Sequence, residues 1–256
     1  MNILFWNLNK NDNWKYINDC LFENKIDIAV FSEYNKLSIN KLRMDNYCMT
    51  DKLSSEHIII LYKKTMKKYH INYGNRYVLI HFEYKNIDYL FVGLHLYDRK
   101  NYAANQRIEL IQSIMSDIVK CEIDYNCKNT IVVGDFNCNP YDDEITQVNA
   151  FNAVLFKELI IQKDNVKHLG KKIDRFYNPI INCIREKTKM YGSFYFNNSF
   201  SGIIWNSLDQ ILIRKKLVKG FKTMKYIKRI NNESLMNKCI PKKRISDHLP
   251  LFAKIK

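Results

Sequence analysis

The chain has 256 residues, of which 46% are hydrophobic and only 7 are Gly and 4 are Pro. This composition excludes a disordered or low-complexity chain, and the length suffices for one large domain with a buried core or for two small ones. The formal net charge of +15 favours polyanionic partners such as nucleic acid or an anionic membrane surface. Lys, Asn, Ile and Tyr are all abundant, however, so the excess is equally consistent with an AT-rich genome and charges spread over solvated faces.

Cysteine usage and hydropathy point to the cell interior. The seven cysteines form no C-x-x-C pair and their number is odd, so neither a disulfide framework nor a zinc site is expected. The N-terminal run Ile3-Leu4-Phe5-Trp6 is too short for a signal-peptide core. No run approaches the roughly 20 apolar residues of a membrane span. We expect a cytoplasmic protein without stable membrane association, and the oligomeric state stays open.

Runs rich in Ile, Val, Phe and Tyr predict eight β-strands. In chain order these are residues 2–6, 26–32, 57–62, 77–84, 88–95, 129–136, 207–213 and 250–255. Apolar residues at helical spacing predict a helix capped by Asp12, a second from about 103 to 120, and a third after Pro140. The third helix is expected to carry Val148, Phe151, Val154 and Leu155.

The order of these elements favours one fold class. Hairpin-like strands mixed with single helices are typical of an α/β sandwich, in which helices flank two packed mixed β-sheets. No glycine-rich nucleotide loop is present. Because no linker or repeat divides the chain, we expect a single catalytic domain over residues 1–256. Residues 158–202 are less regular, and we interpret them as a long excursion that faces the substrate.

Polar side chains end or closely flank the apolar runs. They occur in five places before the C-terminal pair: Asn7 and Asn9, Glu33, His95, Asp135 and Asn137, and Asp209; Asp247 and His248 complete the set. A carboxylate at the end of a buried strand is retained mainly when it is paired, hydrogen-bonded or bound to a metal. Any single member can be a cap, a turn residue or a satisfied core histidine, but six placements in one chain indicate a common site.

This set of side chains suits one kind of chemistry. Oxygen ligands without a thiolate suit a hard divalent cation such as Mg²⁺. Two histidines, each with a carboxylate to orient it, suit general acid/base catalysis or stabilisation of charge on a pentavalent phosphorus. Asparagine amides suit a phosphate oxygen or an attacking water. Together they predict a metal-assisted phosphodiester hydrolase.

Six short segments carry a family resemblance. WNLN, SEYN, GLHL, GDFNCNP, LDQILI and SDHLP, in this order, resemble the endonuclease/exonuclease/phosphatase superfamily, which includes deoxyribonuclease I, abasic-site endonucleases, neutral sphingomyelinases and inositol polyphosphate 5-phosphatases. The matches run from residue 5 to residue 250, and GDFN followed later by SDH is the specific part. The resemblance implies a four-layer α/β sandwich, in agreement with the element pattern.

The resemblance also implies a metal site and a phosphate site. Mg²⁺ would be the cofactor, with Mn²⁺ able to replace it. Glu33 would be the principal metal ligand, assisted by Asn9 and Asp247. Asn7 would help to hold the phosphate or the metal shell, and Asn137 would also contact the phosphate. Many members of the superfamily have Asp where Asn9 stands, so one ligand is expected to be neutral here.

The remaining residues are implied to be catalytic. Asp135 and Asn137 would orient or deprotonate the attacking water. Asp209 would hydrogen-bond His248, which would contact the scissile phosphate and stabilise its developing charge. His95 would be a second imidazole near the phosphate or the leaving group; deoxyribonuclease I and the sphingomyelinases have histidine here, whereas abasic-site endonucleases often have tyrosine.

Four further residues are weaker candidates. Glu56 precedes the strand at 57–62 and could pair with His95. Tyr177, Asn178 and Tyr195 lie where the family builds substrate-contacting loops, and for them base stacking and ordinary loop packing are equally good interpretations.

Three functions remain to be distinguished. The first is a Mg²⁺-dependent nuclease acting on DNA or RNA, which the basic balance favours. The second keeps the site but acts on a phospholipid or an inositol phosphate. The third is a catalytically silent nucleic-acid-binding module that uses only the basic surface.

Overall fold

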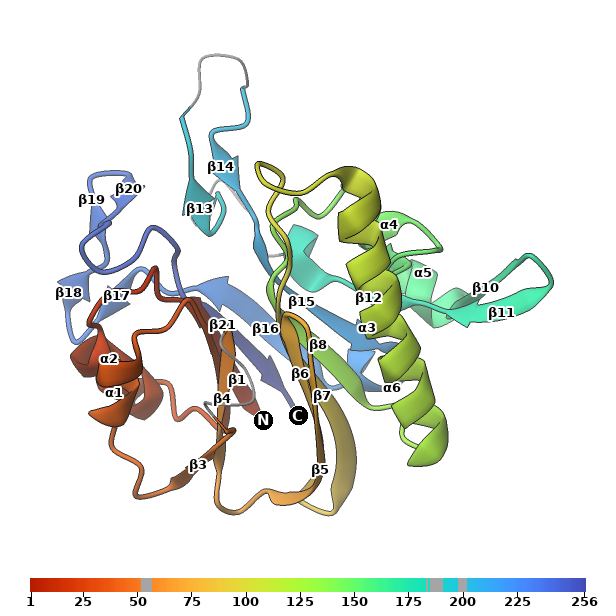
Figure 1. Cartoon of the computed structure of the whole chain (residues 1–256), viewed down its shortest axis with the longest axis horizontal. Helices are drawn as coiled ribbons and strands as arrows, with labels where there is room; N and C mark the ends of the chain where they lie inside the picture. Colours follow the sequence, from red (N-terminus) through yellow and green to blue (C-terminus); the bar gives the residue numbers. More distant parts are fainter. Residues whose placement is uncertain (52–56, 183, 185–190, 198–201) are drawn as a thin grey trace.

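Two mixed β-sheets pack face to face and are covered on their outer sides by helices (Figure 1). The computed structural model describes residues 1–51, 57–182, 184, 191–197 and 202–256. The six-stranded sheet has the order β16-β21-β1-β2-β4-β3, and the seven-stranded sheet has the order β5-β6-β7-β8-β15-β12-β9. The predicted α/β sandwich is therefore confirmed.

The six-stranded sheet is built from the N-terminal strands and the C-terminal strand. Its members are β1 (Asn2–Asn7), β2 (Ile28–Ser32), β3 (Tyr47–Met49), β4 (Ile58–Lys63), β16 (Phe221–Tyr226) and β21 (Leu251–Ile255). The seven-stranded sheet contains β5 (Lys67–Gly74), β6 (Tyr77–Tyr84), β7 (Ile87–His95), β8 (Thr130–Asp135), β9 (Ala153–Val154), β12 (Phe176–Tyr177) and β15 (Asp209–Arg214).

Helices and small hairpins complete the chain. The helices are α1 (Trp14–Glu23), α2 (Lys36–Asn40), α3 (Ala104–Asp124), α4 (Asp143–Thr146), α5 (Lys157–Gln162) and α6 (Lys215–Val218), with a 3₁₀ turn η1 (Pro179–Asn182). Two-stranded pairs form between β10 (Asn165–His168) and β11 (Lys171–Asp174), and between β13 (Phe194–Tyr195) and β14 (Trp205–Asn206). Two more form between β17 (Arg229–Ile230) and β18 (Glu233–Ser234), and between β19 (Met236–Asn237) and β20 (Ile240–Pro241).

Side-chain alternation along β8 explains the layers. Ile131 and Val133 belong to the core between the two sheets, whereas Val132 packs in the cluster that includes Ile111 and Ile114 of α3. Gly93 of β7 allows the sheets to approach closely, because a Cβ atom there would lie 2.8 Å from Cγ1 of Val30.

The prediction of a helix after Pro140 is correct for one turn only and wrong for the residues that follow it. Only α4 forms, and Val154 instead lies in β9, which pairs with β12. Asn152, just before β9, adopts a φ of 50°, which a right-handed helix does not allow. Tertiary pairing with the seven-stranded sheet overrides the helical spacing of the apolar residues.

The prediction that Asp12 caps the first helix is also wrong. The helix begins at Trp14 with Asn13 at the N-cap, and Asp12 pairs with Lys41 at 3.0 Å instead. Two long strands were not predicted, β5 and β16, because each carries exposed lysines that interrupt its apolar pattern, Lys67 and Lys68 in one and Lys222 and Lys225 in the other.

The segment 158–202 contributes to the body of the fold as well as to its periphery. Its strand β12 lies between β15 and β9 within the seven-stranded sheet. The β10–β11 hairpin extends away from the sheets on the right of Figure 1, whereas β13 and β14 project at the top. Among the described residues, no helix combines the length and the apolar character needed to cross a membrane.

Candidate active site

Strand pairing brings five of the predicted residues to one edge of the sandwich. β1 and β2 are parallel, so Asn7 at the end of β1 lies beside Ser32, and Glu33 follows. β7 and β8 are also parallel, which places His95 beside Asp135. β15 runs antiparallel to β8 and begins at Asp209, directly opposite Asp135. The ends of strands from both sheets therefore meet at one place.

Asn7 links the two sheets at this edge. Its Nδ2 donates hydrogen bonds to Oε1 of Glu33 at 2.9 Å and to Oδ2 of Asp135 at 3.0 Å. Its Oδ1 accepts a hydrogen bond from the backbone N–H of Asn9 at 3.0 Å. Because Asn7 is buried, this single amide fixes two carboxylates from different sheets relative to each other.

The backbone is unusual where the two loops of this edge meet. Asn9, Lys10 and Glu33 all have positive φ values, of 47°, 57° and 45°. The Lys10 N–H donates to the Glu33 carbonyl at 2.7 Å, which joins the two loops. A left-handed conformation in a non-glycine residue costs of order 1–3 kcal/mol and is concentrated at functional sites. Here it directs the Glu33 side chain, which is 32% exposed, into a pocket.

His248 and Asp209 form a buried pair. Nδ1 of His248 lies 2.8 Å from Oδ2 of Asp209, which has no exposed surface. Burial alone would lower the pKa of His248, but the carboxylates of Asp209 and Asp135 outweigh it and raise that pKa. Burial also raises the pKa of Asp209, while the His248 imidazolium opposes this. We therefore assign His248 as an imidazolium at neutral pH.

The pKa of His95 is shifted in the direction opposite to that of His248, which favours its neutral form. Its Nε2 lies 3.7 Å from Oε1 of Glu33 and 3.9 Å from Oδ2 of Asp135. Burial lowers the pKa of His95, although both carboxylates act to raise it. The Nε2 of His248 also lies 3.9 Å from Oδ2 of Asp135. Two imidazoles with pKa values shifted in opposite directions thus flank one carboxylate, a pattern that suits distinct roles.

The side chain of Asn137 has an acceptor, Oδ1, that no hydrogen bond between the described residues uses. Its backbone N–H donates to Oδ1 of Asp135 at 2.9 Å, and its Nδ2 donates to the Leu96 carbonyl at 2.8 Å. These bonds, with a φ of 51°, fix the side chain so that its Oδ1 is the atom left to accept a hydrogen bond. Oδ1 of Asn137 can therefore accept a hydrogen bond from a water, and one of the two N–H groups of Nδ2 is taken by Leu96.

These groups line a cavity of about 550 Å³, which is large enough for a small ligand or part of a polymer. Glu33, His95, Asp135, Asn137 and His248 all contribute to its wall. The wall also contains Lys10 and Arg76, two cations that the sequence analysis did not select. Arg76 lies in the turn between β5 and β6 and could not be recognised, because β5 was not predicted.

The donor atoms of the site suit a hard cation. Glu33 and Asp135 supply carboxylate oxygens, and no described cysteine lines this cavity. The donor atoms of Asp135, Asp209 and His248 also lie within 4.8 Å of one another. That grouping suits a metal less well, because Nδ1 of His248 is already in a hydrogen bond with Oδ2 of Asp209. Glu33 is therefore the better candidate ligand.

The structure does not bring every predicted residue to the cavity. Asp247 is half-buried beside His248, and no hydrogen bond between the described residues joins its carboxylate to Glu33 or Asn9. Tyr177 is buried in β12, where its hydroxyl accepts from Asn182. Glu56 lies outside the described residues.

Asn178 is connected to the site through hydrogen bonds to residues adjacent to the catalytic candidates. It is fully buried and donates to Oε1 of Gln210 at 2.6 Å, and Nε2 of Gln210 donates to the Cys138 carbonyl at 2.7 Å. Cys138 follows Asn137, and Gln210 follows Asp209. These bonds join the segment after β12 and the loop that carries Asn137 to β15, which begins with Asp209.

The segment around Tyr195 contacts the site through a neighbour. Tyr195 packs edge-on against Trp205 at 5.4 Å and lines a second cavity with the basic residues 242–244. Phe194 forms a β-bridge with His248, and the two rings lie 4.8 Å apart. Because side chains alternate along β13, Phe194 meets the imidazole and Tyr195 faces away from it. Tyr195 therefore does not contact His248, and its part in substrate binding stays a prediction.

Comparison with known proteins supports the fold through structure alone. Neither a family model nor a curated protein matches the sequence. A Danio rerio TDP2 in complex with a single-strand DNA product has a TM-score of 0.61 and 14% identity, and the match covers 100% of this chain and 98% of that one.

Two proteins of Bacteroides thetaiotaomicron are also similar in structure. A mannosyl-6-phosphatase has a TM-score of 0.66 and 13% identity over 100% of this chain and 99% of that one. An endonuclease/exonuclease/phosphatase family protein has the same TM-score and identity over 100% of this chain and 97% of that one. The chain thus has the fold of the endonuclease/exonuclease/phosphatase superfamily.

Proposed function

We propose that the chain is a Mg²⁺-dependent phosphodiesterase that hydrolyses nucleic acid. The observation that carries this proposal is the pair of carboxylates joined by Asn7, Glu33 and Asp135, directly beside the buried Asp209–His248 pair. One side of the cavity suits a cation and the other suits a phosphate, which is the arrangement that phosphoester hydrolysis needs.

Glu33 is the proposed principal ligand of Mg²⁺; Asn9 and Asp247, the further ligands that the resemblance implies, do not line the cavity. When bound, the cation would neutralise charge on the phosphate group. Mn²⁺ prefers the same oxygen donors and should replace it.

Separate residues of the chain are proposed to activate the attacking water, stabilise the developing charge and position the phosphate. Asp135 takes the proton of an attacking water that Asn137 Oδ1 helps to orient, and the water oxygen then forms the new bond to phosphorus. The protonated His248 donates from Nε2 to a phosphate oxygen and stabilises the charge that develops there. The bond to the leaving oxygen breaks, and that oxygen takes up a proton from solvent. The neutral His95 lies where it can position the phosphate.

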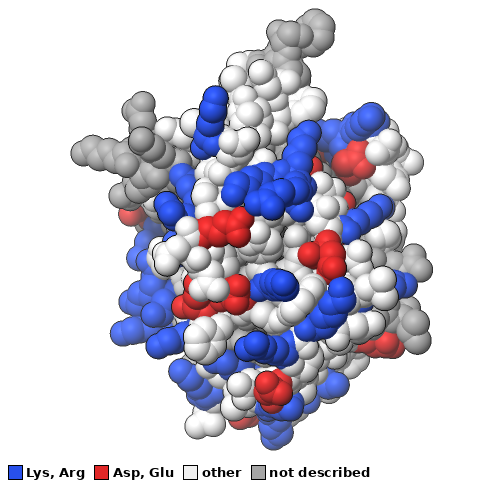
Figure 2. Space-filling model, turned by 90° about the vertical axis from the view of Figure 1, so that its left-hand side faces the viewer, with Lys and Arg blue, Asp and Glu red and all other residues white. Residues whose placement is uncertain are grey.

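Aromatic and basic side chains beside His248 support a nucleic-acid substrate. Phe194 packs against His248, and Phe196, which is 53% exposed and follows the end of β13, stacks on Phe194 with 6.3 Å between the ring centroids. The cavity beside Tyr195 is lined by Lys238, Lys242, Lys243 and Arg244. Stacking surfaces next to cations are typical of proteins that bind single strands. Figure 2 shows Lys and Arg spread over one face, with several acidic groups among them.

A phospholipid or phosphate monoester is the second candidate substrate. The exposed Phe196 and Ile203, at 53% and 60%, lie on the hairpin that projects beside the site, and such residues also suit a lipid surface. One structural relative is a mannosyl-6-phosphatase. A silent binding module is disfavoured, because every catalytic candidate is retained.

The test is to incubate the purified protein with plasmid DNA, single-stranded DNA and RNA, each with Mg²⁺ or with EDTA. Parallel reactions contain sphingomyelin vesicles, an inositol polyphosphate and a sugar phosphate. We expect metal-dependent cleavage of a nucleic acid that His248→Ala abolishes. Conversion of a lipid or a monoester without nucleic-acid cleavage would support the second candidate instead, and no conversion in any reaction would reject both.

A further inference from the structure

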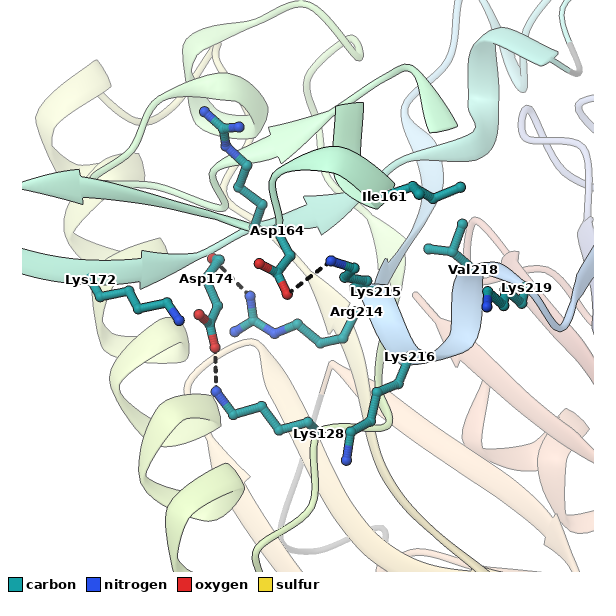
Figure 3. A pocket seen from close by; sticks show the side chains of 11 residues that line it. Lys128, Ile161, Asp164, Lys172, Asp174, Arg214, Lys215, Lys216, Val218 and Lys219 are labelled. Atoms are coloured by element: carbon teal, nitrogen blue, oxygen red, sulfur yellow. Dashed lines mark hydrogen bonds and ion pairs between the residues drawn. The ribbon is translucent and has the colours of Figure 1, made fainter. Parts of the chain in front are cut away.

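A further cavity, distinct from the candidate site and from the cavity beside Tyr195, lies at the opposite end of the strands that carry the candidate site. It has a volume of about 480 Å³ and is bounded by α5, β11, α6 and the end of β15 (Figure 3). β15 runs from Asp209 at the candidate site to Arg214 in this cavity, which at about 3.3 Å per residue separates the two by about 17 Å. The two cavities share no lining residue.

The charge of this cavity is strongly unbalanced. Seven of its eleven lining residues are Lys or Arg, and only Asp164 and Asp174 are acidic. Asp174 pairs with Lys128, and Asp164 lies 3.5 Å from Lys215. Arg214 is paired with Glu122. Among the described ion pairs, no carboxylate partner is found for the other four cations that line the cavity, Lys172, Arg175, Lys216 and Lys219.

Arg214 gives the cavity a rigid floor. Its side chain is 4% exposed and is held by Glu122, with Nε 2.8 Å from Oε1 and Nη2 3.2 Å from Oε2. The guanidinium lies over the ring of Phe176, 3.8 Å from its centroid, and Nη1 donates to the Asp174 carbonyl at 2.9 Å. These bonds occupy Arg214, and Lys128 and Lys215 are paired with carboxylates, so Lys172, Lys216 and Lys219 are the lining lysines available to an anion.

The walls of the cavity combine charge with apolar surface. Figure 3 shows Lys172 and Asp174 on the β11 side, Lys216 below, and Ile161 and Val218 on the opposite side. Such a cavity can place a ring against the apolar side chains and phosphates against the ammonium groups. Its volume lies within the range of small-molecule sites and is too small to enclose a nucleic-acid duplex.

We propose that this cavity binds a small ligand that carries several phosphates and is the size of a nucleotide. The proposal is independent of the proposed catalytic activity, because it uses other residues at the far end of β15. Lys172, Lys216 and Lys219 supply the charge, and Ile161 and Val218 supply the apolar contact.

The test is calorimetric titration of the purified protein, in EDTA, with adenosine diphosphate and with inorganic tripolyphosphate. The variant Lys172→Glu/Lys216→Glu reverses two exposed charges of the cavity. The matched control is Lys222→Glu/Lys254→Glu, which changes the net charge equally on the other sheet. We expect one site per chain, a loss of affinity of at least tenfold in the cavity variant, and unchanged affinity in the control variant and in His248→Ala.

Three results would overturn the proposal. No saturable binding of either compound to the unmodified protein would leave the cavity without a ligand of this class. Equal losses in the cavity variant and the control would assign binding to net charge. Binding that His248→Ala abolishes and the cavity variant retains would place the ligand in the candidate active site.

Discussion

Asp135 and Asp209 are direct partners in the antiparallel pairing of β8 with β15, and both side chains are buried. Two buried carboxylates at such a position repel each other unless a cation lies between them. His248 supplies that charge, with Nδ1 at 2.8 Å from Asp209 and Nε2 at 3.9 Å from Asp135. The electrostatics of the site therefore depend on an imidazolium delivered from the loop before the last strand.

Replacing His248 tests its proposed role at the phosphate. We expect His248→Ala to lower kcat by about 10²- to 10⁴-fold, because the proposed donor to the developing charge is removed, while binding of the nucleic acid persists. Cleavage rates of a labelled oligonucleotide and its affinity in EDTA measure the two effects. His168→Ala, an exposed histidine in β10, is the control. Unchanged hydrolysis in His248→Ala would remove this residue from the mechanism.

The pH dependence should report the state of His248. Asp209 and Asp135 raise the pKa of His248, so the imidazolium persists at neutral pH and is lost only at alkaline pH. Asp209→Asn removes the nearer carboxylate, lowers this pKa and should move the alkaline limb of the pH–rate profile to lower pH. Titration of the His248 ring by NMR measures the pKa directly. An unchanged pKa and an unchanged limb in the variant would contradict the imidazolium assignment.

Asn7 should influence metal binding without contributing a charge. Asn7→Ala leaves Glu33 and Asp135 without the amide that fixes them, so we expect Mn²⁺ affinity to fall by about 10- to 100-fold. Titration calorimetry of the purified protein with Mn²⁺ measures the effect, and circular dichroism checks the fold. Equal affinity in a folded variant would show that the amide does not organise the carboxylates for a cation.

Among the candidate ligands, Glu33 should contribute most to the affinity for the cation. Glu33→Gln keeps the size of the side chain but removes the charge, so Mn²⁺ affinity should fall by at least about tenfold and hydrolysis should require more metal. Asp12→Asn makes the same change of charge at an exposed carboxylate that pairs with Lys41, and should leave the affinity unaltered. If both variants bind Mn²⁺ like the unmodified protein, the metal site lies elsewhere.

The projecting hairpin separates the two candidate substrates. Phe196→Ala should raise KM for single-stranded DNA by roughly tenfold if the ring stacks on a base, and should not alter hydrolysis of a small synthetic phosphodiester. Ile203→Ala removes an aliphatic side chain from the same hairpin and should leave KM for DNA unchanged. Binding to lipid vesicles that both substitutions weaken would identify the hairpin as a lipid-contacting element instead.

Local sequence was sufficient for much of the fold. The predicted strands 2–6, 88–95 and 129–136 correspond to β1, β7 and β8 within one residue at each end, because buried strands need continuous apolar runs. The pattern failed where tertiary pairing decided the conformation. Val154 follows a helical spacing but lies in β9, which pairs with β12, and exposed lysines interrupt the apolar pattern of β5 and β16.

The sequence by itself determined which side chains stand at the strand ends, because apolar runs and the polar residues that close them are local features. Only the tertiary structure decided which of them meet. The parallel pairs β1–β2 and β7–β8 bring Asn7 between Glu33 and Asp135, and packing of the two sheets brings His248 to Asp209. The pKa values of both histidines, the contact of Phe194 and the basic cavity around Arg214 depend on burial and on distances between remote segments, which no local pattern encodes.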